Sequence, residues 1–288
     1  MTLEPPLASA SAQRVVVVGA GRWGQVHLLR WAQLLGRPVD LVIDPHPSPE
    51  VGVSDRPSLA SCVEGELLGV IAIVAVPISS LATVSLQLLE AGVKAILIEK
   101  PGACTPSELA TIQTRAREVG VKVAVGYIER FNIASGPLIC ALEAWWLSRA
   151  PRPWLEIRRS GKGEERVDRP KRLDLWCHDV NLLQRSARRA GLSLERSELK
   201  VDERGRLSLG GVEIGAFCAT TAPGQRSWSI GERSYTLMEP LTSHTQALDP
   251  LSLECLAFAR WVTEGVWSTS LCALDEAIET LSALTDHR

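Results

Sequence analysis

A glycine-rich segment near the start of the chain has the residue types and spacing of a phosphate-binding loop. It matches the pattern G-x-G-x-x-G, directly follows the apolar run 14–18, and opens a segment with helical apolar spacing. In that context Gly19 permits a tight turn, Gly21 lets the backbone approach a pyrophosphate, and Gly24 allows close packing of helix on strand. Free amides and a partial positive charge at the helix start then favour the phosphates. The alternative is a glycine turn without a ligand, but we predict a nicotinamide dinucleotide site, to which Arg22 and Trp23 also contribute.

Asp44 is a second group with a chemical use in such a site. It ends the apolar run 39–43 and lies 25 residues after Gly19. A carboxylate at this position accepts hydrogen bonds from the adenosine ribose hydroxyls and repels a 2′-phosphate, which favours NAD over NADP. Two alternatives stay open: Asp44 forms the turn before Pro45, and the nearby Arg22 and His46 accommodate NADP.

These residues need a parallel sheet to hold them. Apolar runs alternate with segments of helical spacing, which indicates strands at 14–18, 39–43, 70–76, 95–98 and 122–125 and helices at 23–35, 59–68, 81–91 and 106–119. Strands that alternate with helices are typical of a parallel sheet covered on both faces. We therefore predict an α/β fold whose residues 13–126 form a doubly wound Rossmann domain.

The pattern changes after Gly126. Helical spacing occurs at 133–147, 173–190, 250–263 and 273–284, and strand-like runs occur at 154–159 and between 199 and 238. Turn signals separate the later runs, as in an antiparallel meander. We therefore expect residues 127–288 to form an α+β domain, with a mostly antiparallel open sheet, for substrate binding and oligomerisation.

Composition limits the partners and the location. The 31 basic and 33 acidic residues leave a net charge of −2, which does not favour nucleic acid as a partner. Seven cysteines, none in a C-x-x-C spacing, predict reduced thiols rather than disulfides. The first 13 residues lack the pattern of a signal peptide, and no apolar run reaches the roughly 18 residues of a membrane span. We expect a cytoplasmic protein with no membrane or metal partner.

Further motifs occur in an order that resembles one family of enzymes. They are Val76-Pro77, Leu89-Glu90-Ala91-Gly92, Glu99-Lys100-Pro101, the run Gly126-Tyr127-Ile128-Glu129-Arg130-Phe131-Asn132, and Asp174-Leu175-Trp176-Cys177-His178-Asp179. With the glycine motif and the last two helices, this order resembles the glucose–fructose oxidoreductase, inositol dehydrogenase and MocA family over nearly the whole chain. Two departures are Leu81, where the family often has histidine, and Val76, where it has a small polar residue.

The resemblance implies roles for particular side chains. It places Lys100 near the nicotinamide ring and the reacting hydroxyl, and Val76, Pro77 and Glu99 at the cofactor. The family's acid and histidine correspond to Asp174 and His178, which lie four residues apart and would share a helix face. Histidine titrates near neutral pH and can accept the hydroxyl proton.

Four more residues are candidates for substrate binding. Tyr127, Arg130 and Asn132 match the family's segment at the substrate cleft, and Trp176 lies within the D-x-x-x-H segment. Arg130 is equally consistent with a phosphate or carboxylate ligand and with a structural salt bridge. The other tryptophans are expected in the core and at interfaces.

The sequence thus predicts an NAD(P)-dependent dehydrogenase that oxidises a secondary hydroxyl of a sugar, cyclitol or sugar nucleotide. The run Glu129-Arg130-Phe131-Asn132 resembles members that act on UDP-N-acetylglucosamine at C3. The alternatives are an imine or biliverdin-type reductase on the same fold and a non-catalytic NAD(H)-binding sensor or subunit. The open sheet also predicts a homodimer or homotetramer.

Overall fold

The computed structural model describes residues 12–46, 54–148, 151–159, 172–194, 198–219, 226–237 and 249–285. The described residues fall into two compact units. One contains 12–131 and 249–275, and the other contains 132–237 and 276–285. The sequence analysis placed the boundary at Gly126 and assigned everything after it to the second domain. Residues 249–275 lie instead in the first unit.

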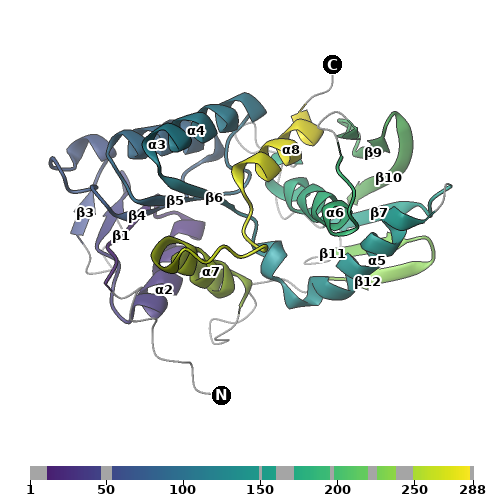
Figure 1. Cartoon of the computed structure of the whole chain (residues 1–288), viewed down its shortest axis with the longest axis horizontal. Coiled ribbons are helices and arrows are strands. Elements are labelled where there is room, and N and C mark those ends of the chain that lie inside the picture. The colour runs from purple at the N-terminus through teal and green to yellow at the C-terminus, as the bar shows by residue number, and fades with distance from the viewer. Residues whose placement is uncertain are drawn as a thin grey trace. The chain divides into compact units, whose positions relative to one another are not determined.

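The first unit is built on a six-stranded sheet with the order β3-β2-β1-β4-β5-β6, and every pair of neighbouring strands is parallel. This is the order of a doubly wound Rossmann sheet, as predicted. Helices α3 and α4 cover one face and α2 and α7 cover the other (Figure 1). The strands are β1 (Val15–Val18), β2 (Leu41–Ile43), β3 (Ser54–Arg56), β4 (Ile71–Val74), β5 (Ala95–Glu99) and β6 (Lys122–Gly126). The helices are α2 (Arg22–Leu35), α3 (Ile78–Glu90), α4 (Pro106–Val119) and α7 (Pro250–Glu264), with short 3-10 turns η1 (Leu59–Ser61) and η2 (Ile128–Phe131).

Burial explains the strands. The four valines of β1 are at most 3% exposed, because helices cover both faces of the strand. The predicted helix at 59–68 is only the 3-10 turn η1, since Gly65 has a φ of +77°, which a helix does not allow. Strand β3 is short and polar, and the apolar pattern did not predict it.

Helix α7 joins the first unit through its apolar face. The Asp249 side chain caps its start by accepting a hydrogen bond from the Ser252 amide at 3.0 Å. Leu251 and Phe258 are fully buried in one core with Trp31 of α2 and the residues of β1. Burial of these large side chains holds a segment distant in sequence to the Rossmann sheet.

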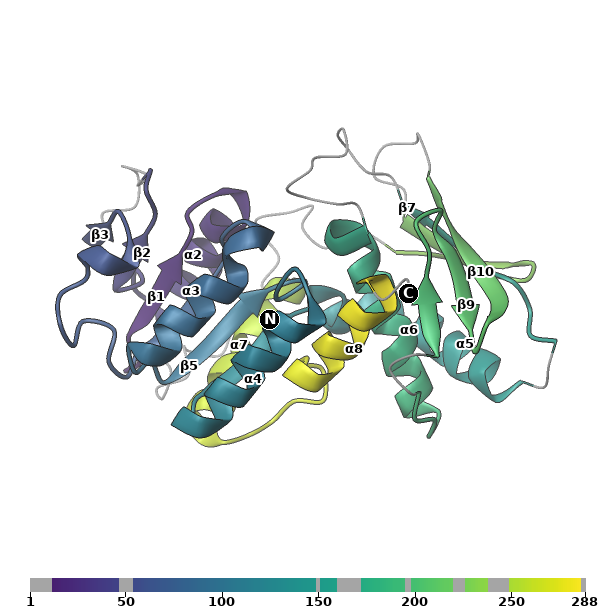
Figure 2. The same cartoon turned by 90° about the horizontal axis from the view of Figure 1, so that it is seen from above.

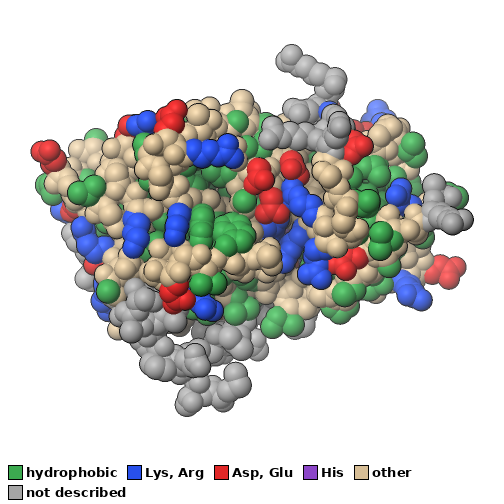
Figure 3. All heavy atoms as spheres, in the orientation of Figure 1, with side chains coloured by type: hydrophobic (Ala, Val, Ile, Leu, Met, Phe, Trp, Pro, Cys, Tyr) green, Lys and Arg blue, Asp and Glu red, His purple; other side chains and the backbone are tan. Residues whose placement is uncertain are grey.

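Aromatic residues reach the surface on the outer side of α7. The Trp261 ring packs edge-on against Trp267, with centroids 4.7 Å apart, and the Lys122 ammonium lies 5.6 Å from the Trp261 centroid. Trp267 is 39% exposed and Val266 is 48% exposed. Hydrophobic side chains accordingly show at the surface over α7 (Figure 3).

The second unit contains a mixed sheet with the order β12-β11-β7-β10-β9-β8. Four of its five strand pairs are antiparallel, while β7 and β10 are parallel. The predicted open, mostly antiparallel sheet is therefore confirmed, but the predicted meander is interrupted, because β7 lies between β10 and β11. The strands are β7 (Leu155–Arg159), β8 (Leu199–Val201), β9 (Arg206–Leu209), β10 (Val212–Ala219), β11 (Arg226–Ile230) and β12 (Arg233–Thr236).

Helices pack on the face of this sheet that carries Trp228 (Figure 2). They are α5 (Gly136–Leu147), preceded by the 3-10 turn η3 (Ile133–Ser135), and α6 (Cys177–Arg189), preceded by the π-helical turn η4 (Arg172–Trp176). Helix α8 (Leu274–Thr285) starts in the first unit and continues in the second. Side chains alternate along a strand, so Ser227 and Ser229 point to the opposite, polar face of the sheet.

Candidate cofactor and active site

The loop between β1 and α2 can be built only with glycine at two positions. Gly19 has a φ of +94°, and a Cβ there would lie 2.6 Å from the Ala75 carbonyl oxygen. A Cβ on Gly24 would lie 1.8 Å from the Gly19 carbonyl oxygen. The chain therefore passes close to the end of β4 and folds back on itself, as the sequence predicted for these two glycines.

Gly21 is different, because no atom lies within 4 Å of the position that its Cβ would occupy. It is the N-cap of α2, its backbone is extended, and no side chain caps the helix there. No acidic residue lies in the first turn of α2. The helix start thus presents amides and its partial positive charge to open space, next to the exposed Arg22 and the half-buried Trp23.

Asp44 directly follows β2 and contacts the same loop. Its Oδ2 accepts a hydrogen bond from the Ala20 amide at 2.6 Å, and its Oδ1 accepts one from the His46 amide at 2.7 Å. The carboxylate is half-buried and each oxygen keeps lone-pair capacity. Asp44 forms a turn, which was one alternative, and it also lies beside the glycine loop, where a ribose acid is needed.

The open Gly21 position, the uncapped helix start and the carboxylate of Asp44 together fit a dinucleotide. The helix start suits the pyrophosphate, and Asp44 suits the ribose hydroxyls. No helix of the described residues has both the length and the apolarity to cross a membrane. Within the described ranges, no three His, Cys, Asp or Glu side chains are grouped so that they could hold a metal ion.

The ends of β4 and β5 bring the other predicted cofactor residues to the same edge of the sheet. Val76 follows β4, with its amide 3.0 Å from the position of a Cβ on Gly19, and Pro77 is the N-cap of α3. Glu99 ends β5 and Lys100 follows it, half-buried, with a cis peptide bond to Pro101. Parallel strands end at a common edge, which is why these separated motifs meet there.

Glu99 does not point freely towards a ligand. It is 8% exposed, and its Oε1 lies 2.7 Å from Nε2 of the fully buried His27 on α2. The Glu99 carbonyl also accepts a hydrogen bond from the Gly102 amide at 3.0 Å. This carboxylate therefore ties the turn that carries Lys100 to the helix that begins at the glycine loop.

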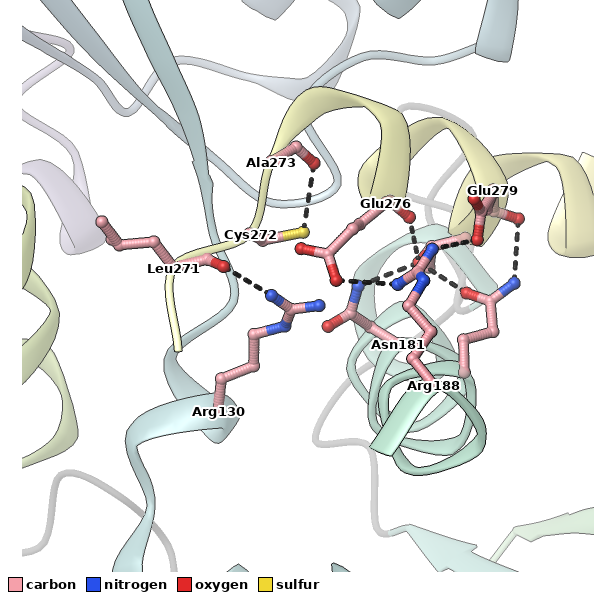
Figure 4. A network of polar contacts seen from close by, with 10 residues as sticks. Arg130, Asn181, Arg188, Leu271, Cys272, Ala273, Glu276 and Glu279 are labelled. Carbon is pink, nitrogen blue, oxygen red and sulfur yellow. Dashed lines mark hydrogen bonds and ion pairs between the residues drawn. The ribbon is translucent and has the colours of Figure 1, made fainter. Parts of the chain in front are cut away.

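For Arg130 the sequence left two roles open, binding of a substrate phosphate or carboxylate and a structural contact. Its side chain is 5% exposed. It donates a hydrogen bond from Nη1 to the Leu271 carbonyl at 2.6 Å, as Figure 4 shows. This contact joins η2 to the segment before α8 and favours the structural alternative. Tyr127 is 1% exposed, and Asn132 is buried and caps η3 by accepting from the Ala134 amide at 3.1 Å.

The D-x-x-x-H segment lies in the second unit. Asp174 and Trp176 belong to η4 and are half-buried, whereas His178 lies in the first turn of α6 and is 8% exposed. The helical segment predicted at 173–190 begins with the π-helical turn η4, which contains Asp174, and continues as the α-helix α6. Such turns change the angular spacing of side chains and are frequent at functional sites. The Trp176 ring stacks on Phe217, with centroids 4.8 Å apart.

Helix α6 is held by polar contacts on several sides, which is unusual for a buried helix. Trp228 Nε1 donates to Asp179 Oδ1 at 3.2 Å. Asn181 donates to Thr280 at 3.0 Å, and Arg188 pairs with Glu276 at 2.7 Å and with Glu279. Figure 4 shows these last contacts between α6 and α8. They fix the rotation of α6 and therefore the direction in which His178 points within its unit.

Two residues of the first unit escaped the sequence analysis. His27 lies one turn after Gly24, and Glu254 lies among the apolar residues of α7. Both are buried polar groups, since His27 is 0% and Glu254 1% exposed. The sequence does indicate the burial of Glu254, because its spacing from Leu251 and Phe258 places it on the same apolar face of the helix.

Known structures share this fold. The WlbA (WbpB) dehydrogenase from Thermus thermophilus, solved with NAD and UDP-GlcNAcA, is 16% identical, with a TM-score of 0.67 over 94% of this chain and 93% of that one. The UDP-N-acetylglucosamine 3-dehydrogenase GnnA from Acidithiobacillus ferrooxidans is 19% identical, with a TM-score of 0.68 over 94% and 95%. GenD2 from gentamicin A biosynthesis, solved with NAD, is 18% identical, with a TM-score of 0.66 over 95% and 93%. None of the curated proteins matches the sequence.

The sequence itself carries a family signature in the first unit. Residues 13–127 match the oxidoreductase family with an NAD-binding Rossmann fold, and this segment contains the glycine loop, Asp44 and the Glu99-Lys100-Pro101 motif. The match confirms the resemblance inferred from the motifs. Residues 13–127 thus carry the sequence signature of the glucose–fructose oxidoreductase, inositol dehydrogenase and MocA family of oxidoreductases with an NAD-binding Rossmann fold.

Proposed function

We propose that this oxidoreductase is an NAD-dependent dehydrogenase that oxidises a secondary hydroxyl group of a sugar or sugar nucleotide. The observation that carries the proposal is the open helix start at Gly21, with Asp44 fixed beside it by the Ala20 amide at 2.6 Å. This arrangement supports recognition of a dinucleotide with free ribose hydroxyls. The family's oxidoreductase chemistry supports the reaction class.

Three side chains are proposed to act on the reacting hydroxyl. Bound NAD⁺ supplies the hydride acceptor. His178 accepts the hydroxyl proton, since histidine is the side chain that most often acts as a general base near neutral pH. Asp174 orients the imidazole, and the ammonium of Lys100 stabilises the negative charge that develops on the oxygen.

The substrate class is supported by two of the similar structures. One is named a UDP-N-acetylglucosamine 3-dehydrogenase, and another was solved with UDP-GlcNAcA. We therefore propose a UDP-linked amino sugar as the first substrate to test. Tyr127, Asn132 and Trp176 are the proposed substrate contacts, and the hydrogen bond of Arg130 to Leu271 gives that residue a supporting role.

The experiment measures NADH formation with a panel of UDP-sugars, free hexoses and inositols. On the best substrate, Lys100→Ala and His178→Ala should each lower turnover by about 10²- to 10⁴-fold, the usual contribution of a general acid–base group. Asp174→Asn should lower turnover by a similar or smaller factor, because this residue orients the base without taking the proton. Each variant should still bind NAD⁺.

Lys94→Ala is a matched control, since Lys94 is exposed and its ammonium donates a hydrogen bond to the side chain of Gln13 at 2.8 Å. It should leave turnover unchanged. Full activity of His178→Ala would remove this residue from the role of base. Tight NAD⁺ binding without NADH formation on any compound would instead favour a sensor or a non-catalytic subunit.

A further inference from the structure

A buried cluster of ionisable groups lies beneath the Lys100 turn. His27 of α2 is its best defined member. Nε2 lies 2.7 Å from Glu99 Oε1, whereas Nδ1 is buried without a hydrogen-bond partner among the described residues. A protonated Nδ1 would be a buried donor with no acceptor, which costs about 1–3 kcal/mol. The contact between Nε2 and Oε1 lets the imidazole donate a hydrogen bond to the Glu99 carboxylate.

Glu254 of α7 reaches the same region from the other side. It is 1% exposed, and its Oε2 lies 3.2 Å from the position that a Cβ on Gly126 would occupy. The Ile98 carbonyl oxygen lies 3.5 Å from that same point. Because Ile98 precedes Glu99 and Gly126 ends β6, the Glu254 carboxyl group lies at the adjoining ends of β5 and β6.

The neighbouring cations do not fully compensate a second carboxylate beside Glu99. Arg30 pairs with Asp249 at 2.7 Å, so these two compensate each other. Glu99 and Arg130 are the charged groups that act on Glu254, and they have opposite signs. An ionised Glu254 would add an incompletely compensated buried negative charge, which is strongly unfavourable. Burial, followed by repulsion from Glu99, raises the pKa of Glu254 well above its ordinary value of 4.5, while Arg130 lowers it less. The groups around it are His27, Arg30, Glu99, Arg130, Asp249 and Cys255.

We propose that Glu254 is a positioning residue of the cofactor site, whose buried carboxyl group fills the space at the ends of β5 and β6 and, together with the Glu99–His27 pair, keeps the Lys100 turn in place against helix α2. The pair links two ends of the site, because α2 begins at the glycine loop and Glu99 precedes Lys100. The proposal rests on the proposed function only in assigning the Lys100 turn to the cofactor site.

The proposal fixes the sign of a pH effect. A carboxyl group whose pKa is raised on folding holds its proton in the folded protein and loses it in the unfolded chain. The folded state is therefore favoured below the ordinary pKa of 4.5, and this advantage disappears as pH rises from 4.5 through the raised pKa. Within that window, the unfolding equilibrium constant should rise by up to about tenfold per pH unit.

The test compares Glu254→Gln, which is neutral at every pH and close in shape, with the wild type. Denaturant unfolding of the full chain, without substrate, is measured from pH 5 to pH 8. The stability of Glu254→Gln relative to the wild type should increase steadily with pH. Glu264→Gln is the control, because Glu264 lies on the same helix but is 31% exposed and pairs with Arg260. Its curve should stay parallel to that of the wild type.

A second measurement tests the positioning role through the affinity for NAD⁺. Glu254→Ala removes the carboxyl group and should weaken NAD⁺ binding by about tenfold, a shift of about 1.4 kcal/mol. Glu254→Gln should restore the affinity to within about twofold, because it keeps the shape and the neutral charge. If Glu254→Ala does not fold, the pH comparison with Glu254→Gln still decides the proposal.

Three results would overturn the proposal. Parallel unfolding curves for the wild type and Glu254→Gln would show that the carboxyl group does not hold its proton in the folded state. Wild-type NAD⁺ affinity in Glu254→Ala would remove the positioning role. Equal loss of affinity in Glu254→Gln and Glu254→Ala would show that the charged carboxylate is required. None of these measurements uses a sugar, so failure of the proposed reaction would leave them interpretable.

Discussion

Alanine substitutions at Gly21 and Gly24 should affect different properties, cofactor affinity in the first case and stability in the second. At Gly21 nothing lies within 4 Å of an added Cβ, and the backbone, with φ −65° and ψ −170°, is one that alanine can adopt. Alanine is a poorer N-cap than glycine, but it gains about 0.4–1 kcal/mol by restricting the unfolded chain. These effects oppose each other, so Gly21→Ala should change the free energy of unfolding by less than about 0.5 kcal/mol.

The same substitution should damage cofactor binding. If the open space at Gly21 receives a pyrophosphate, a methyl group there displaces the phosphate from the amides at the start of α2. Loss of one hydrogen bond to a charged group costs about 1.5–3 kcal/mol, which corresponds to roughly 10- to 100-fold in affinity. Gly24→Ala should instead lower the stability of the folded protein. Its Cβ would lie 1.8 Å from a backbone oxygen that cannot move independently, so we expect a loss of about 3 kcal/mol or more of stability.

The assay pairs denaturant unfolding without cofactor with titration of NAD⁺ followed by calorimetry. Gly21→Ala should unfold at the wild-type denaturant concentration and bind NAD⁺ at least about tenfold more weakly. Gly120→Ala is a control for the folding measurement, because Gly120 is also open but has a φ of +70° and ends α4, away from the glycine loop in sequence. It should lose stability through backbone strain and keep NAD⁺ affinity. Wild-type affinity in Gly21→Ala would refute the assignment of this space to the pyrophosphate.

Two further predictions concern cofactor choice and assembly. NAD(H) should bind at least about tenfold tighter than NADP(H), about 1.4 kcal/mol, because Asp44 beside the glycine loop disfavours a 2′-phosphate; a fluorescence titration that shows a preference for NADP(H) would remove Asp44 from this role. A dimer or tetramer is expected through the sheet face that carries Ser227 and Ser229. Light scattering of the wild type and of Ser229→Glu tests this, since a charge in the interface should shift the mass towards the monomer, and a wild-type monomer at micromolar concentration contradicts the prediction.

The sequence predicted the Rossmann unit well because its determinants are local. A strand buried on both faces is a run of four valines, and the following glycines mark a turn that other residues do not allow. The positions of Asp44, Val76 and Lys100 then follow from topology, because each lies within two residues of the end of a parallel strand. Once the strands are identified, the edge where these residues meet is determined.

The second unit was harder because its pairing is not local. Turn signals between 199 and 238 correctly indicated strands, yet they carry no information about a strand from elsewhere in the chain. Strand β7 enters between β10 and β11 and pairs parallel to β10, with Ile157 beside both Phe217 and Trp228. Likewise, the spacing of Asp174 and His178 fits a regular α-helix, and nothing in that spacing distinguishes it from the π-helical turn that forms.

The assignment of α7 shows what a sequence pattern leaves out and what it still contains. Periodicity identified the helix correctly but not the sheet on which it packs, since an apolar face fits any apolar surface. Glu254, the polar residue on this apolar face, is the more specific indication of what the helix packs against. Burial of an ionised glutamate is costly, so Glu254 among Leu251 and Phe258 indicates either other polar groups in the core or a carboxyl group that keeps its proton. In the first unit, buried ionisable side chains also occur on α2, at the end of β5 and in η2, where His27, Glu99 and Arg130 are found. A glutamate on a core face therefore indicates that the helix packs against other polar groups, but it does not indicate which unit supplies them, since α6 of the second unit also buries Asp179 and Arg185.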